Sequence, residues 1–380
     1  MLFGAELPTW ALFTELILAG VVVILAGARF TRLADTLAER LNIGAGWIGL
    51  ILLATVTSLP ELVTGGTATA IGNVDLAMGG ILGSCSFNIT LIVLLNALWG
   101  GGSVLRDVSR SHALTSSFGL ALIGLALLGI VLMDKFTHRP AVAQVCEITW
   151  AAAILVTYIG CMRLVYRYEC ALNSKMEPTA ERHKVGTGLS LGIAAMAAII
   201  VAASWWLAHL GDILSTHEIK MIGRPLGSTF VGACFLALAT SLPEIVTSVT
   251  AVRLGKLDLA LGNIFGSNMF NIAVIPALKA ISLLNGETVM LAGHASNTNQ
   301  NLIAGLLAIL LTTIALGGLA YQSKRRMLRR FGFDSILIAI TYAGGMILLL
   351  LSGRSIQTLG DRDGRGGDRV SHVAREVEDG

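Results

Sequence analysis

Long, uninterrupted apolar segments constrain this chain more than any other feature of its sequence. A helix needs about 20 apolar residues to cross the ~30 Å core of a bilayer. Segments of nearly that length or longer occur at 10–28, 45–71, 76–98, 113–133, 143–162, 187–209, 226–252, 258–281, 302–321 and 334–352. Only 13% of the residues are charged, against about 25% in ordinary globular proteins. The sequence therefore predicts an all-α, polytopic membrane protein with ten spans and excludes a soluble enzyme or a disordered protein.

The Lys and Arg residues between these segments predict the orientation in the bilayer. Apart from the C-terminal tail, the odd-numbered connections contain seventeen of them, and the other side has five, namely Lys135, Arg139, Lys220, Arg224 and Lys279. Cytoplasmic loops carry the excess of positive residues. We therefore expect cytoplasmic odd-numbered connections and both termini outside, in a multi-pass protein of the inner (plasma) membrane. The formal charge of +3 is too small to indicate a nucleic-acid partner.

An internal repeat relates the two halves of the chain. The segment TSLPELVT at 57–64 matches TSLPEIVT at 240–247, and the same offset of 183 aligns residues 83–84 with 266–267 and 87–89 with 270–272 without a gap. Five crossings separate the second and seventh spans, so the copies are predicted to be antiparallel, as in transporters with inverted repeats. We predict a five-helix repeat at 1–162, a cytoplasmic linker at 163–186, an inverted five-helix repeat at 187–352 and a disordered polar tail at 353–380.

Each repeat places a carboxylate inside an apolar span. Glu61 and Glu244 would cost several kcal/mol as unpaired charges in a bilayer. Each follows a proline, Pro60 or Pro243, that lacks a backbone donor and is expected to break the second and seventh helices. The carbonyls four residues earlier, those of Val56 and Ala239, are predicted to be freed. Broken helices at membrane depth are tolerated where they line a cavity.

Hydroxyl and amide groups accompany the two carboxylates. Ser84 and Asn88 are four residues apart and share a helix face, as do Ser267 and Asn271 in the second repeat. Oxygen donors without thiolate or imidazole suit hard cations such as calcium or sodium. Two negative charges neutralise one divalent ion and would equally hold two or three monovalent ions with help from neutral oxygens, so the pattern predicts a shared site for ion exchange. It predicts no cofactor.

The doubled TSLPE and GS-x-x-FN motifs resemble the alpha-repeats of the sodium/calcium exchangers, within the calcium/cation antiporter superfamily. The resemblance covers residues 10–352 and is of the prokaryotic type without regulatory domains. It implies that Glu61 and Glu244 bind calcium with the carbonyls of Thr57 and Thr240. For sodium or a shared site it implies Ser58, Ser84, Asn88, Ser241, Ser267 and Asn271, with the carbonyls of Ala54 and Ala237.

The sequence departs from the family pattern at two positions. Asn271 stands where the prokaryotic exchangers have an aspartate, and Cys85 replaces the asparagine of the first GSN motif. The calcium site is expected to survive both changes, while ion stoichiometry depends on them.

Several other residues carry structural predictions. Gly79 with Gly83, and Gly262 with Gly266, form GxxxG steps that predict close helix packing. Glu147 has no counterpart in the second repeat, and neither has Glu15. Both are expected to pair with interfacial arginine or water, and a proton-linked group is the alternative.

The leading functional prediction is therefore a calcium antiporter coupled to sodium that works by alternating access. The substrates would be calcium and sodium ions, and the bilayer would be its surroundings. Proton- or potassium-coupled calcium exchange remains an alternative. A passive channel and an intramembrane hydrolase are the alternatives from other classes. An enzyme is disfavoured because the sequence contains neither HExxH nor Gly-x-Ser-x-Gly.

Overall fold

The structure is a computed structural model that describes residues 9–100, 103–135, 138–173, 184–216, 218–219, 224–225, 239–284, 298–321, 326–328 and 331–351. Within these ranges, nine helices have the length and apolar composition needed to cross a membrane. The long helices are α1 (Thr9–Leu41), α5 (Val74–Trp99), α6 (Ser111–Asp134), α7 (Pro140–Asn173), α8 (Thr187–Thr216), α11 (Leu257–Leu284), α12 (Thr298–Tyr321) and a last helix at Phe333–Leu351. The prediction of an all-α membrane protein is confirmed.

The strands of the described ranges are short and lie in connections. β1 (Glu218–Ile219) pairs with β2 (Arg224–Pro225), and β3 (Arg326–Leu328) pairs with β4 (Phe331–Gly332), both antiparallel. One 3₁₀ helix, η2 (Val104–Arg106), connects α5 to α6. These elements contribute no layer to the membrane bundle.

The second span is broken, as the proline predicts. It consists of α2 (Ala45–Ile48), the π-helix η1 (Gly49–Leu53), α3 (Ala54–Thr57), a turn at Ser58 and α4 (Leu59–Ala70). Pro60 lies in the first turn of α4, where a missing backbone donor costs nothing. The expected release of the Val56 carbonyl is wrong, because the backbone N–H groups that cap α3 reach the carbonyls of Ala54 and Val56. The tightened turn supplies donors for carbonyls that the proline leaves unpaired.

The seventh span repeats this turn. α10 (Leu242–Arg253) begins after Ser241, whose φ of −89° and ψ of 2° are close to the −93° and 4° of Ser58. Pro243 lies in the first turn of α10. Residues 226–238 of the predicted span, including Ala237, lie outside the described residues.

Two helices extend well beyond their predicted ends. α1 continues past residue 28 to Leu41, so Arg29, Arg32 and Arg40 lie on the helix and not in a connection. α7 continues past residue 162 to Asn173. Charged residues are good helix formers, and α1 ends only where Asn42 adopts a φ of 51°.

The division into two domains with a linker at 163–186 stays a prediction. The helical part of that segment, up to Asn173, belongs to α7. Residues 174–183 and the tail at 353–380 lie outside the described residues.

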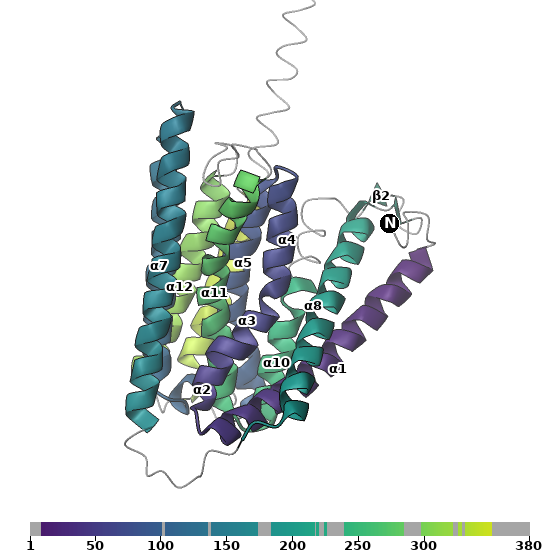
Figure 1. The fold of residues 1–380 in the computed structure, drawn as a ribbon, viewed down its shortest axis with the longest axis vertical. Helices are drawn as coiled ribbons and strands as arrows, with labels where there is room; N and C mark the ends of the chain where they lie inside the picture. The colour runs from purple at the N-terminus through teal and green to yellow at the C-terminus, as the bar shows by residue number, and fades with distance from the viewer. Residues whose placement is uncertain are drawn as a thin grey trace, which may run out of the picture.

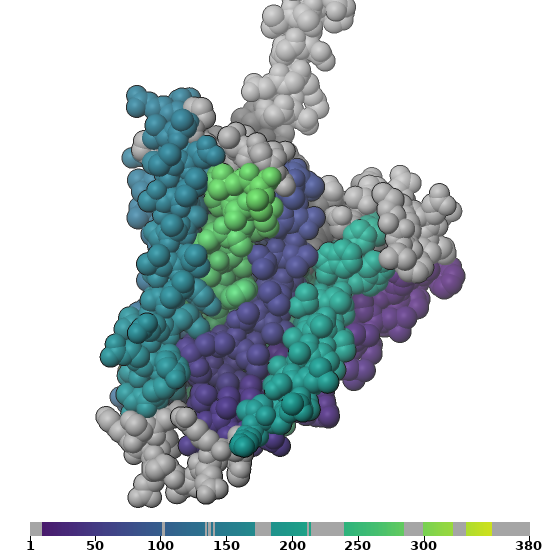
Figure 2. Space-filling view, in the orientation of Figure 1, coloured from purple at the N-terminus to yellow at the C-terminus, as the bar shows by residue number. Residues whose placement is uncertain are grey.

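The central helices pack into an upright bundle, and α1 and α8 lie inclined at one side of it (Figure 1). α4 occupies the upper part of this view and α10 the lower part. α11 packs against elements of both repeats, including η1, α4, α5 and α10. Figure 2 shows α8 and α1 together on one side, with α7 on the opposite side. α1 packs on α8 and α10, so the inclined pair contacts the bundle beside the second break.

Candidate ion-binding site

The two carboxylates lie where the broken helices restart. Glu61 is in the first turn of α4 and Glu244 is in the first turn of α10. Both are buried, with 4% and 1% of their surfaces exposed. The N-terminus of a helix carries a partial positive charge that favours a carboxylate there. The breaks therefore place two helix N-termini inside the bundle, each holding one acid.

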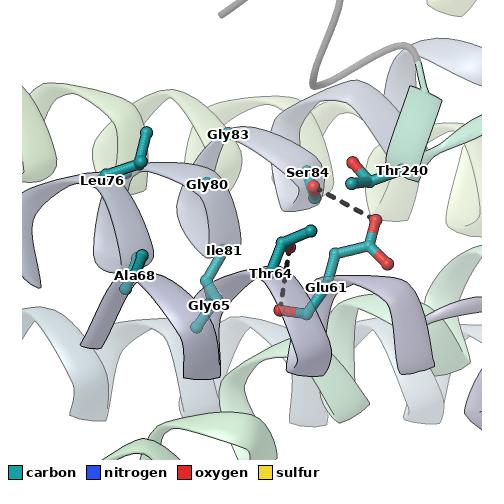
Figure 3. A pocket seen from close by; sticks show the side chains of 12 residues that line it. Glu61, Thr64, Gly65, Ala68, Leu76, Gly80, Ile81, Gly83, Ser84 and Thr240 are labelled. Atoms are coloured by element: carbon teal, nitrogen blue, oxygen red, sulfur yellow. Dashed lines mark hydrogen bonds between the residues drawn. The ribbon is translucent and has the colours of Figure 1, made fainter. Parts of the chain in front are cut away.

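Hydroxyl groups connect the two repeats around these acids. Ser58 Oγ donates to Glu244 Oε1 at 3.1 Å, across the repeats. Ser84 Oγ donates to Glu61 Oε1 at 3.5 Å, and Thr240 lies beside the same carboxylate (Figure 3). The hydroxyls of Thr57 and Ser267 are 3.5 Å apart. The structure thus brings together the acids and the hydroxyl residues that the sequence predicted.

Several buried polar atoms at this place have no hydrogen-bond partner in the described part of the chain. They are Oε2 of Glu61, Oε2 of Glu244, Oδ1 of Asn88, Oγ of Ser241 and both side-chain amide atoms of Asn271. Buried polar groups in native proteins are nearly always paired, so such a cluster calls for an ion or water. All but the amide nitrogen offer oxygen, and the cluster is therefore suited to a hard cation.

Neutral oxygens outnumber the acids at this site. No group of three or more His, Cys, Asp or Glu residues that could hold a metal occurs in the described ranges. A cation here would be bound by two carboxylates together with hydroxyl, amide and carbonyl oxygens, which calcium and sodium accept and zinc or copper do not favour.

Asn268 is a residue of the site that the sequence reasoning missed. Asn88 Nδ2 donates to Asn268 Oδ1 at 3.2 Å, and Asn268 Nδ2 donates to the carbonyl of Cys85 at 3.0 Å. Cys85 and Asn268 are separated by the repeat offset, so each contacts its own counterpart where the two repeats meet. The loss of one asparagine from the paired GSN motifs was the available signal.

The predicted carbonyl ligands are only partly described. The carbonyl of Ala54 accepts the N–H of Ser58 at 3.1 Å and the hydroxyl of Thr57 at 3.5 Å. Its counterpart, Ala237, lies outside the described residues. A role of either carbonyl in sodium binding stays a prediction, as does ligation by the carbonyls of Thr57 and Thr240.

A cavity of about 150 Å³ extends from Glu61 between α4 and α5 (Figure 3). The residues that line it are Glu61, Thr64, Gly65, Ala68, Leu76, Ala77, Gly79, Gly80, Ile81, Gly83, Ser84 and Thr240. This volume has room for several waters. The Glu61 carboxylate therefore lies at the wall of a space that an ion and its water could occupy.

The glycine steps differ between the repeats. A Cβ at Gly266 would come within 2.7 Å of the Leu50 carbonyl, and one at Gly262 would overlap the Gly46 carbonyl, so close packing is confirmed there. A Cβ at Gly83 would meet no atom of the described residues within 4 Å. The counterparts of Leu50 and Ala54, at 233 and 237, lie outside those residues, so close packing at Gly83 stays a prediction. A Cβ at Gly79 would lie 3.3 Å from Asn301 Oδ1 of α12, so that step is close to a neighbouring helix. Gly79 and Gly83 also line the cavity.

Glu147 is paired inside the protein and not at the interface. Its Oε2 accepts from Lys279 Nζ at 2.5 Å, and both side chains are almost fully buried. Lys279 was expected to contribute to an outer connection, but it lies within α11. Opposite charges that pair closely can be retained in a low-dielectric interior, which explains how a lysine can lie inside this span.

Comparisons with known proteins show which family the chain is similar to. The model of the family described as sodium/calcium exchanger protein matches residues 12–167 and 188–351. A protein named CaxA from Alkalimonas amylolytica is 29% identical over 346 residues, covering 89% of this chain and 99% of its own length. The sodium/calcium exchanger MaX1 of Methanosarcina acetivorans is 26% identical over 293 residues, covering 70% of this chain and 82% of its own length.

The fold also matches a solved structure. A structure of the sodium–calcium exchanger NCX_Mj superposes with a TM-score of 0.63 at 19% sequence identity, covering 88% of this chain and 99% of that one. The inverted-repeat membrane fold is therefore shared. Because the family model covers most of both repeats, the chain belongs to the sodium/calcium exchanger family, a family of membrane cation antiporters.

Proposed function

We propose that this protein exchanges calcium for sodium across the plasma membrane by alternating access at the site between α4 and α10. The observation that carries the proposal is the pair of buried carboxylates, each with an oxygen that has no partner among the described residues, beside atoms of Asn88, Ser241 and Asn271 that likewise have none there. Such a set costs free energy when empty and is stabilised by a bound cation.

Charge balance supports competition between the two ions. Glu61 and Glu244 together offer two negative charges, which one calcium ion neutralises. Calcium prefers six to eight oxygen ligands, so carbonyls or water would complete its coordination. Two or more sodium ions would occupy the same space with help from Ser84, Ser267 and the other neutral donors. Because calcium and sodium bind to the same carboxylates, binding of one ion displaces the other. This competition is the physical basis of exchange.

The hydroxyls beside the acids are compatible with both the empty and the loaded state. Ser58 and Ser84 each donate to a glutamate. A hydroxyl oxygen keeps its lone pairs while it donates. A cation could therefore bind to the serine and the glutamate together without breaking their hydrogen bond.

Flux measurements on purified protein test the coupling ion. We expect calcium-45 uptake into proteoliposomes when an outward sodium gradient is imposed, and little uptake under potassium or proton gradients of the same size. The matched control is the Glu61→Gln/Glu244→Gln double variant in identical liposomes. Uptake driven by a proton or potassium gradient would show that this ion, and not sodium, is the coupling ion. Uptake without any counter-ion gradient would indicate a channel.

We further propose that the odd-numbered connections face the cytoplasm and that both termini lie outside. The excess of Lys and Arg at the helix ends and connections on the side of the odd-numbered connections supports this orientation. A cysteine introduced at Lys175 should react only after the cytoplasmic face is exposed, and one at Gly366 should react in intact cells. Labelling of both positions from one face would contradict the ten-span arrangement.

A further inference from the structure

Asn263 of α11 occupies a position that distinguishes the two repeats. At the offset of 183 its counterpart is Gly80 of α5, which lines the cavity beside Glu61. Asn263 is fully buried, whereas a Cβ at Gly80 would meet no atom of the described ranges within 4 Å. The same place in the two repeats thus holds a buried amide in one and open space in the other.

The hydrogen bonds of Asn263 follow the repeat relationship. Its Nδ2 donates to Thr247 Oγ1 at 2.9 Å and to Ser248 Oγ at 3.0 Å, and its Oδ1 accepts from Thr57 at 3.3 Å. The counterparts of these three partners are Thr64, Gly65 and Thr240, and all three line the cavity of the first repeat. The Asn263 side chain therefore fills the space that corresponds to the cavity.

We infer that Asn263 closes the second access route to the ion site, the route between α10 and α11 that mirrors the cavity between α4 and α5. The inference rests on the proposed exchange function, because a transporter needs one route to each side of the membrane. The amide connects α3 of the first repeat to α10 and α11 of the second, so its hydrogen bonds must break before an ion can pass.

The inference depends on the side chain at this position alone. α2 and η1 cover the same part of α11, with Gly49 against the backbone of Leu259 and Asn263. Their counterparts in the first repeat, residues 228–236, lie outside the described residues. The contrast between Asn263 and Gly80 remains whatever covers α5, because glycine has no side chain with which to fill the space.

Identical threonines provide a matched pair of probes. Thr64 and Thr247 are repeat counterparts, and each donates its hydroxyl to the carbonyl of a proline in the same helix, Pro60 or Pro243. Neither is a proposed ion ligand. In Thr64→Cys the thiol would face the cavity, while in Thr247→Cys it would lie against Asn263. Mass spectrometry of the labelled peptide follows each introduced thiol separately from the native cysteines.

The test measures the rate at which a small cationic methanethiosulfonate reagent modifies each thiol in protein held in lipid nanodiscs. Because thiol reaction rates depend on access, we expect Thr64→Cys to react at least about tenfold faster than Thr247→Cys. Adding Asn263→Gly should raise the rate at Thr247→Cys by at least about tenfold and leave Thr64→Cys unchanged. The control Thr312→Gly removes a buried side chain from α12 and should leave both rates unchanged.

The reciprocal variant tests the same claim without deleting a buried side chain. Gly80→Asn should slow Thr64→Cys by about tenfold or more, because the new amide would fill the cavity. The inference is overturned if Thr247→Cys reacts as fast as Thr64→Cys in the parent protein, or if Gly80→Asn leaves the reaction of Thr64→Cys fast. It is also overturned if Asn263→Gly leaves the rate at Thr247→Cys unchanged, or if Thr312→Gly raises that rate equally. Measuring these rates requires no transport. The inference about Asn263 can therefore be contradicted while sodium-driven calcium flux is observed, and it can hold while that flux is absent.

Discussion

The two repeats have nearly the same motifs but pack differently. In the second repeat, Gly262 and Gly266 of α11 lie against the backbone of the second span, and Asn263 is hydrogen-bonded on both sides. In the first repeat, Gly80 and Gly83 border a cavity that reaches Glu61. Two repeats with nearly the same motifs can therefore differ in structure within one conformation. Alternating access needs such a difference, because the site is open to one side of the membrane at a time.

The turns that precede α5 and α11 also differ between the repeats. The turn before α11 is connected to α1 because Lys256 Nζ lies 3.0 Å from Asp35 Oδ1 and 2.8 Å from Glu39 Oε1. Hydrogen bonds to Glu39 and Asp35 hold the pKa of Lys256 above its usual value. The counterpart of Lys256 is Asn73, which caps α5 by accepting the N–H of Leu76 at 3.2 Å. The second repeat is therefore also tied to its surroundings by charge.

The largest effect is expected from removing either of the two carboxylates that the repeats have in common. Glu61→Gln and Glu244→Gln should each abolish calcium exchange, because calcium needs both charges while glutamine keeps the shape. Calcium-45 flux in proteoliposomes measures this, and Glu39→Gln, at an exposed acid, should retain flux. Exchange at the parent rate in either site variant would show that the two acids are not the shared binding site.

The next largest effect is expected at a contact between helices that is an ion pair in the second repeat and a neutral hydrogen bond in the first. Lys279 of α11 pairs with Glu147 of α7, whereas its counterpart Asn96 of α5 donates to Ser335 of the last helix. Lys279→Met leaves a carboxylate buried beside the lost partner and should destabilise the protein by about 3–5 kcal/mol. Asn96→Ala should cost less, about 1–3 kcal/mol.

Thermal unfolding in detergent ranks these two variants. The double variant Glu147→Gln/Lys279→Met should recover much of the loss, because no unpaired charge remains. Equal melting temperatures for Lys279→Met and Asn96→Ala would contradict the assignment of a charged contact in one repeat and a neutral contact in the other.

The glycine steps provide a smaller and more local comparison. Gly266→Ala should destabilise the protein by about 2 kcal/mol, because its methyl group would press on Leu50 and Ala54. Gly83→Ala adds the same methyl group where no atom of the described residues lies within 4 Å, and it should leave stability nearly unchanged. Melting temperatures of the two variants measure the contrast. Similar losses for both would mean that the repeats are packed alike.

The smallest effect concerns two serines at the helix breaks. Ser58 donates to Glu244, whereas the hydroxyl of Ser241 has no partner in the described residues. In the absence of ions, Ser58→Ala should lower stability by about 1 kcal/mol, and Ser241→Ala should lower it very little. With calcium or sodium added, both variants should bind ions more weakly. Stability losses of equal size without ions would remove this asymmetry.

The sequence predicted the fold and the identity of the central residues because their signals are strong. Apolar length revealed most of the spans, and the doubled TSLPE motif revealed the inversion and the paired acids. It did not reveal the π-helix η1, the extensions of α1 and α7 or the pair formed by Glu147 and Lys279. Those features depend on contacts between distant helices, which neither periodicity nor the repeat encodes.

The asymmetry between the repeats was also visible in principle. Gly80 stands opposite Asn263, and Cys85 stands opposite Asn268, in an otherwise gapless alignment. Their meaning became clear only when Asn263 was found within hydrogen-bond distance of Thr57, Thr247 and Ser248. A substitution between repeats indicates where symmetry fails, and the packing around it indicates why.

The central claim is that one site built on Glu61 and Glu244 holds either calcium or sodium. Equilibrium binding of calcium-45 to the purified protein, with increasing sodium, tests it most directly. We expect one calcium ion bound per chain, displacement of that ion by sodium, and no specific binding in the Glu61→Gln/Glu244→Gln double variant. Calcium binding that persists in the double variant, or that sodium does not displace, would contradict it.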